Sequence, residues 1–202
     1  MSSFKIGFLK LFFIANSLIY GPALLSQTIT HLDSLDNEFD IKVKAMLGND
    51  LSGQMIPYFI VEDKNGTISR DSLRSKVTFI NLWFEACLPC IAEFQALERF
   101  YVTNKPRTGF QFISITFEPD SVIARVKKEK NLTYPIYHLS VDGCRQLISK
   151  MGYPVTLIID KDLKIAYSTA GGSVNPDIAD KHLNLFIQAE LEKVLEKSFG
   201  RH

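Results

Sequence analysis

The stretch VTFINLWFEACLPCIAEF, residues 77–94, joins two apolar patterns around a pair of cysteines. Its first part, 77–84, is a run of β-branched and aromatic residues that predicts a buried strand. After Cys90, helical spacing sets in, with apolar residues at Ile91, Phe94, Leu97, Phe100 and Tyr101. Cys87 and Cys90 therefore lie where a buried strand passes into the N-terminus of a helix.

This placement gives the two sulfurs a specific chemistry. The unpaired N–H groups and the positive end of the helix dipole favour a thiolate at Cys87. A free thiol has a pKa of about 8.5, and helix N-termini and CxxC motifs lower it into the range of roughly 3.5–7.5. Cys90 lies one turn further on and can close a small disulfide ring, and Pro89 needs no N–H partner in a first helical turn. The pattern predicts a redox switch.

Two alternatives apply to the same pair. A CxxC motif can be half of a zinc site, but tetrahedral zinc needs a second pair of ligands at regular spacing. The remaining cysteine is Cys144, and the histidines at 31, 138, 182 and 202 form no H-x₃-H group. We therefore predict no metal site. A purely structural disulfide stays open as the second alternative.

The residues around the cysteines resemble a known family. NLW at 81–83 followed by CLPCIAEF at 87–94 is similar to the N-F-W…C-x-P-C-x-x-E core of the TlpA/ResA-type thioredoxin-like proteins, thiol–disulfide oxidoreductases of the bacterial cell envelope. YPVTLIID at 153–160 resembles that family's proline loop and strand, and 57–66 its opening strand and turn. The resemblance covers roughly residues 55–197. It implies an α/β thioredoxin fold, a central mixed sheet flanked by helices, with an N-terminal β-hairpin extension.

The sequence departs from the family just before the first cysteine, where Ala86 stands in place of the usual Trp. One wall of the thiol site is then more open, and Glu85 would oppose ionisation of Cys87 if its side chain points that way. Asn81 occupies the position of the buried Asp of thioredoxin itself, six residues before the first cysteine. An amide cannot accept the proton, so Glu93 is the candidate base.

The catalytic residues predicted for a thiol–disulfide oxidoreductase are Cys87, Cys90 and Glu93. Cys87 attacks a partner's disulfide, and Cys90 resolves the mixed disulfide, so the pair itself is the redox group and no cofactor is needed. Glu93 lies three residues after Cys90, on roughly the same helix face. A carboxylate there takes the Cys90 proton, provided that burial raises its pKa toward neutrality. An ordinary exposed glutamate is the alternative.

Three residues are predicted to bind the substrate: Tyr153, Pro154 and Trp83. The resemblance implies a cis Tyr153–Pro154 bond facing Cys87, with the Tyr153 backbone pairing with an extended segment of a partner. A trans proline that only starts the strand is the alternative. Trp83 and Phe84 suit packing in the core and the site wall better than a catalytic part. Cys144 is predicted to be free and buried, as a small hydrophobe.

The N-terminus reads as an export signal. Lys5 and Lys10 precede an apolar segment, 11–20, that is short for a membrane span. We predict a signal peptide or N-terminal membrane anchor over 1–26, an N-terminal extension over 27–54 and a thioredoxin-like domain over 55–199. Either fate of residues 1–26 puts the domain in the periplasm or extracytoplasmic cell envelope, where disulfides persist.

The remaining elements follow from apolar alternation and turn residues. We expect strands at 56–62, 110–117, 134–139, 155–160 and 164–168, with Lys64-Asn65-Gly66 as the hairpin turn. Helices are expected from Pro119, over 142–151, and from an N-cap at Asn175 to about Lys197. Ala170-Gly171-Gly172-Ser173 lacks the glycine spacing of a phosphate loop and predicts only a turn.

The resemblance implies reduction of disulfides in envelope proteins, apocytochrome c cysteines among them, with electrons from a membrane thiol donor. A net charge of +1 and the lack of a basic stripe interleaved with aromatics argue against nucleic acid. A peroxiredoxin-like thiol peroxidase is an alternative, although it normally carries Pro and Thr just before its cysteine, where this chain has FEA at 84–86. Two non-catalytic alternatives share the fold: a metallochaperone, whose usual CxxxC spacing is missing, and an interaction module with a structural disulfide.

Overall fold

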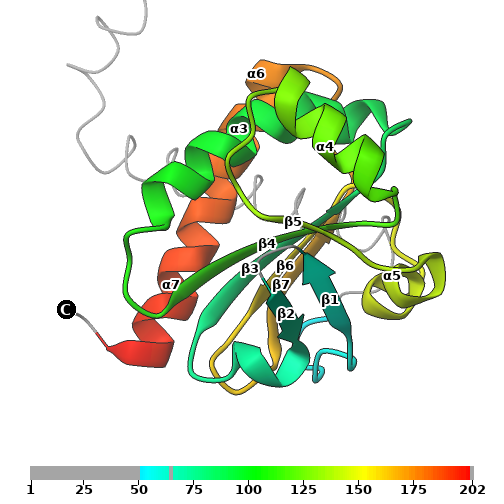
Figure 1. The fold of residues 1–202 in the computed structure, drawn as a ribbon. Helices are drawn as coiled ribbons and strands as arrows, with labels where there is room; N and C mark the ends of the chain where they lie inside the picture. The colour runs from blue at the N-terminus through cyan, green and yellow to red at the C-terminus, as the bar shows by residue number, and fades with distance from the viewer. Residues whose placement is uncertain (1–50, 64–65, 201–202) are drawn as a thin grey trace, which may run out of the picture. The chain divides into compact units, whose positions relative to one another are not determined.

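Seven strands form one sheet in the order β2-β1-β5-β4-β3-β6-β7 in the computed structural model, which describes residues 51–63 and 66–200 (Figure 1). The strands are β1 (Ile60–Asp63), β2 (Gly66–Ser69), β3 (Val77–Trp83), β4 (Phe110–Thr116), β5 (Ile136–His138), β6 (Val155–Ile159) and β7 (Ile165–Ala170). β3 pairs parallel with β4 and antiparallel with β6, so the sheet is mixed, as expected. The N-terminal hairpin β1–β2 joins it through Glu62 and His138.

The helices follow the predicted alternation with the strands. They are the 3₁₀ turn η1 (Arg70–Leu73), α3 (Leu88–Asn104), α4 (Asp120–Glu129), α5 (Val141–Ile148), α6 (Pro176–Lys181), the π-helical turn η2 (His182–Ile187) and α7 (Gln188–Phe199). None of the helices within 51–63 and 66–200 is long and apolar enough to cross a membrane. The predictions for residues 1–50, which include the signal or anchor and most of the extension, lie outside the described residues.

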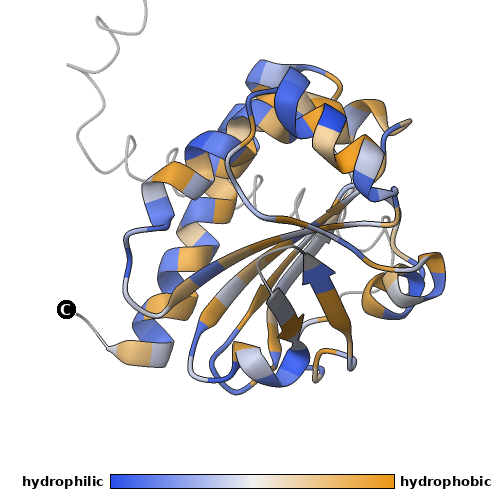
Figure 2. Cartoon of the chain, viewed as in Figure 1, coloured by the Kyte–Doolittle hydropathy of each residue, from blue (hydrophilic) through white to orange (hydrophobic). Residues whose placement is uncertain are grey.

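β3 is apolar along its whole length because both faces of the sheet are covered. Val77, Phe79 and Trp83 belong to a cluster with α3, α4, η2 and α7, whereas Ile80 and Leu82 belong to a cluster on the other face. Figure 2 shows hydrophobic colour along the central strands and mixed colour on the helices. The two clusters hold β3, and therefore the start of α3, in a fixed position.

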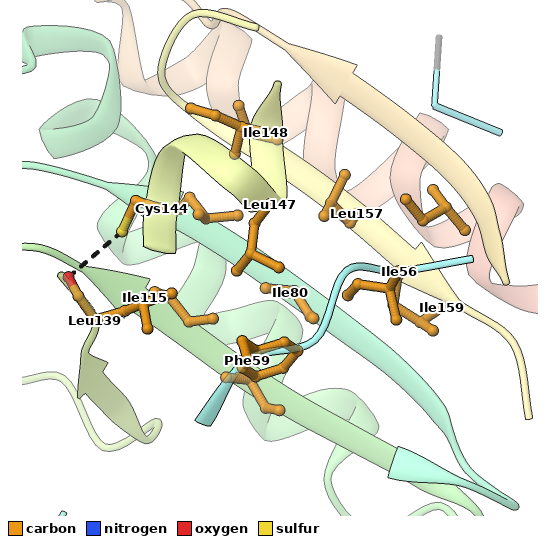
Figure 3. Close-up of a cluster of buried hydrophobic side chains, with 14 of the residues drawn as sticks. Ile56, Phe59, Ile80, Ile115, Leu139, Cys144, Leu147, Ile148, Leu157 and Ile159 are labelled. Atoms are coloured by element: carbon orange, nitrogen blue, oxygen red, sulfur yellow. Dashed lines mark hydrogen bonds between the residues drawn. The ribbon is translucent and has the colours of Figure 1, made fainter. Parts of the chain in front are cut away.

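The second face is covered by α5 and by the chain before β1. Figure 3 shows Cys144, Leu147 and Ile148 of α5 beside the sheet residues Ile115 and Leu157, with Ile56 and Phe59 over the same cluster. The predicted strand at 56–62 was therefore too long. Ile56 and Phe59 bury their side chains against the sheet face, and strand pairing begins only at Ile60.

The C-terminal helix is also interrupted, where one continuous helix was predicted. Asn175 caps α6 as expected, since its side chain accepts a hydrogen bond from the Asp177 N–H at 2.9 Å. The six residues of η2 then adopt π-helical hydrogen bonding before α7 resumes. Leu183 and Ile187 in this turn are buried beneath it. Nothing in the apolar spacing of the sequence marks the change of helix type.

Candidate functional site

Three chain segments meet at the same end of strands β3, β6 and β7. Cys87 follows the end of β3, Pro154 precedes the start of β6, and Gly171 and Gly172 follow the end of β7. The antiparallel registers place Leu82 opposite Val155 and Val155 opposite Ala170, so these ends coincide. The topology therefore brings the cysteine pair, the proline loop and a double-glycine turn to the same place.

The cysteines lie at the predicted transition from strand to helix. Cys87 is the N-cap of α3, and its sulfur accepts from the Cys90 N–H at 3.3 Å. The two residues are joined by a disulfide, with their Cα atoms 5.2 Å apart. Both side chains are buried. Across 51–63 and 66–200, no three His, Cys, Asp or Glu side chains gather where they could hold a metal ion.

Glu93 is a buried acid one turn beyond Cys90. Its side chain is 4 % exposed on α3, where Cys90, Phe94 and Leu97 are buried as well. Loss of hydration disfavours the charged form, and burial raises the pKa of Glu93 from its ordinary 4.5 to about 8. The carboxyl therefore has the burial and the near-neutral pKa on which the predicted proton transfer depends, and the alternative of an exposed glutamate does not hold.

Pro154 and this carboxyl both lie close to Gly172. The Tyr153–Pro154 peptide bond is cis, as the resemblance implied. The Pro154 carbonyl accepts from the Gly171 N–H at 2.8 Å, which ties the proline loop to the turn after β7. A Cβ placed on Gly172 would stand 2.7 Å from Oε1 of Glu93 and 3.1 Å from Cγ of Pro154. Glu93 and Pro154 therefore meet around the bare Cα of Gly172.

The Tyr153 side chain turns into the protein. Its ring packs edge to face against Phe84 and Phe117, at centroid distances of 5.2 and 6.1 Å. Its side chain interacts with the thiol of Cys144, which is free and buried, as predicted. Burial raises the pKa of the Cys144 thiol to about 11. The Tyr153 side chain is thus half-buried and held by these contacts.

Trp83 is fully buried, so its ring supports the site from beneath and presents no surface to a substrate. It packs edge to face on Phe94 of α3 with ring centroids 5.0 Å apart. The indole therefore fixes α3, and with it Cys90 and Glu93, against the end of β3. Of the two roles considered for Trp83, this geometry fits packing beneath the site wall and does not fit direct contact with a substrate.

The charge just before the cysteines is paired. The Glu85 carboxylate forms an ion pair with Arg125 of α4, and the Glu85 N–H donates to Oε1 of Glu118 at 2.8 Å. Both side chains of the ion pair are exposed. Arg125 therefore offsets the negative charge that the sequence placed two residues before Cys87.

Sequence reasoning missed two parts of this site. Gly172 was assigned to a simple turn, and Cys144 was expected to be only a small hydrophobe. The available signal was weak, namely two glycines directly after a strand whose partner strand begins just after Pro154. The interaction between Tyr153 and Cys144 connects the proline loop with α5. No local sequence pattern predicts this contact.

A buried CxPC disulfide at a helix N-terminus, beside a proline loop on a mixed sheet, defines a thiol–disulfide oxidoreductase of thioredoxin-like fold. Residues 52–168 match the AhpC/TSA family, and the chain belongs to that family. It is similar to the thiol-disulfide oxidoreductase ResA of Geobacillus thermodenitrificans, with 27 % identity over 131 residues, which cover 62 % of this chain and 73 % of that protein. The resemblance to TlpA/ResA-type proteins is thereby confirmed.

Solved structures confirm the fold. A thiol:disulfide interchange protein of the thioredoxin family from Chlorobium tepidum superimposes with a TM-score of 0.55 at 19 % identity, covering 73 % of this chain and 99 % of that one. The thioredoxin domain of a thiol-disulfide oxidoreductase from Bacteroides vulgatus gives 0.54 at 19 % identity, covering 67 % and 100 %. StoA from Bacillus subtilis gives 0.51 at 18 % identity, covering 62 % and 95 %.

Proposed function

We propose that the chain reduces disulfide bonds in proteins of the cell envelope, apocytochrome c cysteines among the candidate substrates. The observation that carries the proposal is the buried Glu93 carboxyl one turn from Cys90. A reductant must deprotonate its second cysteine before it can release the partner, and a base performs this best when its pKa lies near the working pH. Burial gives Glu93 such a pKa, about 8.

The reaction proceeds in two exchanges. The Cys87 thiolate attacks one sulfur of the partner's disulfide, that S–S bond breaks, and the departing sulfur takes up a proton. Cys90 then gives its proton to the Glu93 carboxylate and attacks the Cys87 sulfur. The mixed disulfide breaks, the Cys87–Cys90 disulfide forms, and the partner's second sulfur departs and takes up a proton, so the partner leaves with two thiols. Two electrons have passed to the partner, and a membrane dithiol donor returns the pair to its reduced state.

The partner docks beside the disulfide, at this end of strands β3, β6 and β7, as an extended segment. The Tyr153 backbone offers strand-like hydrogen bonds beside the disulfide. Two apolar side chains near it are strongly exposed, Leu88 between the cysteines at 67 % and Val174 after the double glycine at 65 %. A contact with a protein chain covers such side chains, whereas a small peroxide needs neither of them.

An extracytoplasmic location, by export with or without a retained N-terminal anchor, is part of the proposal. A dithiol that donates electrons must be reduced again after every cycle. Such a reductant is needed where protein disulfides otherwise persist, and these compartments lie outside the cytoplasm. Fractionation of cells that produce the full chain, with the protein located by antibody, tests this part separately.

The reduction potential tests the direction of electron flow. Full-length protein is equilibrated with glutathione buffers, and the thiols of Cys87 and Cys90 are counted by alkylation and mass. A value near or below about −230 mV, in the range of thioredoxin and glutaredoxins, supports a reductant. A value nearer −120 mV, that of a strong oxidant, reverses the direction and overturns the proposal.

Two variants test the assigned parts. Cys90→Ser is expected to accumulate the mixed disulfide with a disulfide-bonded peptide, and Cys87→Ser to form none. Rapid consumption of hydrogen peroxide by the reduced protein, with little exchange toward the peptide, would instead favour the thiol peroxidase.

A further inference from the structure

The turn between β7 and α6 contains two glycines with different requirements. Gly171 has a φ of +80°, in the left-handed region that favours glycine. Gly172 does not lie at a positive φ, so its backbone would accept any residue. Gly172 therefore matters because it has no side chain, and not because of its backbone conformation.

That space is occupied by the Glu93 carboxyl group. A Cβ on Gly172 would stand 2.7 Å from Oε1 and 3.5 Å from Cδ of Glu93, and 3.1 Å from Cγ of Pro154. Real Cβ atoms do not approach other atoms within 3.0 Å, so something must move. Gly152, just before the proline loop, has no atom within 4 Å of the corresponding point. The crowding against Glu93 and Pro154 therefore arises at Gly172 and not at Gly152.

The turn itself is not free to withdraw. The Gly171 N–H donates to the Pro154 carbonyl at 2.8 Å, and Ala170 is held in register with Val155. On the other side, the Asn175 N–H donates to Oγ of Ser173 at 3.1 Å, directly before α6. The carboxyl, in contrast, lies at the end of a flexible side chain. A side chain at residue 172 therefore displaces the Glu93 carboxyl.

We propose that Gly172 is a positioning residue for proton transfer from Cys90, because its bare Cα leaves the recess that holds the Glu93 carboxyl. The inference rests on the proposed function, in which Glu93 is the base for Cys90. Proton transfer requires the donor and acceptor within hydrogen-bond reach. Displacement of the carboxyl slows the resolving step and leaves the first attack by Cys87 unchanged.

The test uses full-length Gly172→Ala, Glu93→Gln, the double variant, and Gly152→Ala as the matched control. Each reduced protein is mixed with a disulfide-bonded peptide between pH 6 and 9. Acid quenching and mass spectrometry then follow formation and decay of the mixed disulfide. We expect Gly172→Ala to form it at the wild-type rate and to resolve it about tenfold to a hundredfold more slowly, with a changed pH profile. Gly152→Ala should match the wild type in both steps.

The double variant separates a displaced base from a distorted loop. Glu93→Gln has no base to displace, so adding Gly172→Ala should slow resolution by less than about twofold. An equal further loss in the double variant, or wild-type resolution by Gly172→Ala, overturns the inference. If Glu93→Gln is slow while Gly172→Ala is normal, the inference fails alone. If Glu93→Gln resolves like the wild type, the proposed base fails as well.

Folding is monitored by the thermal midpoint of each variant. Should Gly172→Ala not fold, Glu93→Asp takes its place, because it shortens the acid by one methylene and withdraws the carboxyl from the recess while Gly172 stays unchanged. The same slowing of resolution with normal formation is expected. Wild-type resolution by Glu93→Asp overturns the inference.

Discussion

The side chain of Tyr153 interacts with the buried thiol of Cys144, so the residue before the active-site proline is in contact with helix α5. Cys144 in turn donates to the Leu139 carbonyl at 3.6 Å, the contact drawn as a dashed line in Figure 3. The proline loop is thus connected to the core on the second face of the sheet, although the sequence marked Cys144 only as a buried apolar residue.

This connection predicts an energetic coupling between the two side chains. Tyr153→Phe and Cys144→Ala each remove one partner of this interaction, and each should lower the free energy of unfolding by about 1 kcal/mol or more. The double variant should lose less than the sum, by about 0.5–1 kcal/mol. Urea unfolding of the oxidised proteins measures all four values. Tyr58→Phe, at an exposed ring, is the control and should change the free energy of unfolding little. Strict additivity of the Tyr153→Phe and Cys144→Ala effects would show that the two side chains do not interact.

The same burial predicts that Cys144 is chemically silent. It is 0 % exposed, and burial raises the pKa of its thiol to about 11. Because the thiolate is the reactive form, iodoacetamide at pH 8 should leave Cys144 unlabelled in the reduced, folded protein. All three cysteines should react in urea. Mass spectrometry counts the labels, and rapid native labelling of Cys144 would contradict the described packing.

Most of the sheet was predictable because its signal is local. The continuous apolar run of β3 requires cover on both faces, and the change to helical spacing after Cys90 locates the start of α3. Strand ends were less predictable. Ile56 and Phe59 have the residue types of a strand, but they bury their side chains by crossing the sheet face. Tertiary packing, which no short window contains, decides such cases.

The site was predictable only in part for a similar reason. Cys87 and Cys90 are close in sequence, and their chemistry follows from their spacing. Glu93 was assigned from its helix position and the family resemblance, but its burial depends on segments far along the chain. The contact of Gly172 with Glu93 exists only because β7 pairs with β6. A single sequence without its fold carries no mark of that pairing.

The Glu85–Arg125 ion pair predicts an electrostatic effect on Cys87. Arg125→Ala leaves the Glu85 charge unpaired two residues before the nucleophile, which disfavours its thiolate. We expect slower alkylation of Cys87 at low salt, by no more than about fivefold because the pair is exposed. Glu85→Gln should have the opposite sign.

The control for this effect is Lys128→Ala, which removes an equal charge from the same helix. It should alter the rate less than Arg125→Ala does, because the pairing with Glu85 is what distinguishes Arg125. Raising the salt to 1 M, where charges are screened within about 3 Å, should erase the difference between Arg125→Ala and the wild type. A difference that persists at high salt would point to a change in structure.

The buried Glu93 predicts how stability depends on pH. Its pKa is about 8 in the folded protein, against about 4.5 for an ordinary glutamate. Between these values the folded state holds a proton that the unfolded state has lost, so the free energy of unfolding falls as pH rises through this window. The slope contributed by one such group is at most about 1.4 kcal/mol per pH unit. Above pH 8 this contribution levels off.

Glu93→Gln removes the titrating group while keeping the shape of the side chain. Its free energy of unfolding should therefore fall less steeply than that of the wild type between pH 5 and 8, and the two slopes should agree at higher pH. Urea unfolding of the oxidised proteins at each pH measures the difference, because cysteines in a disulfide do not titrate. Glu196→Gln, at an exposed position on α7, should keep the wild-type slope. Parallel curves for wild type and Glu93→Gln from pH 5 to 8 would mean that Glu93 is ionised in the fold, and the proton acceptor for Cys90 would then have to be sought elsewhere.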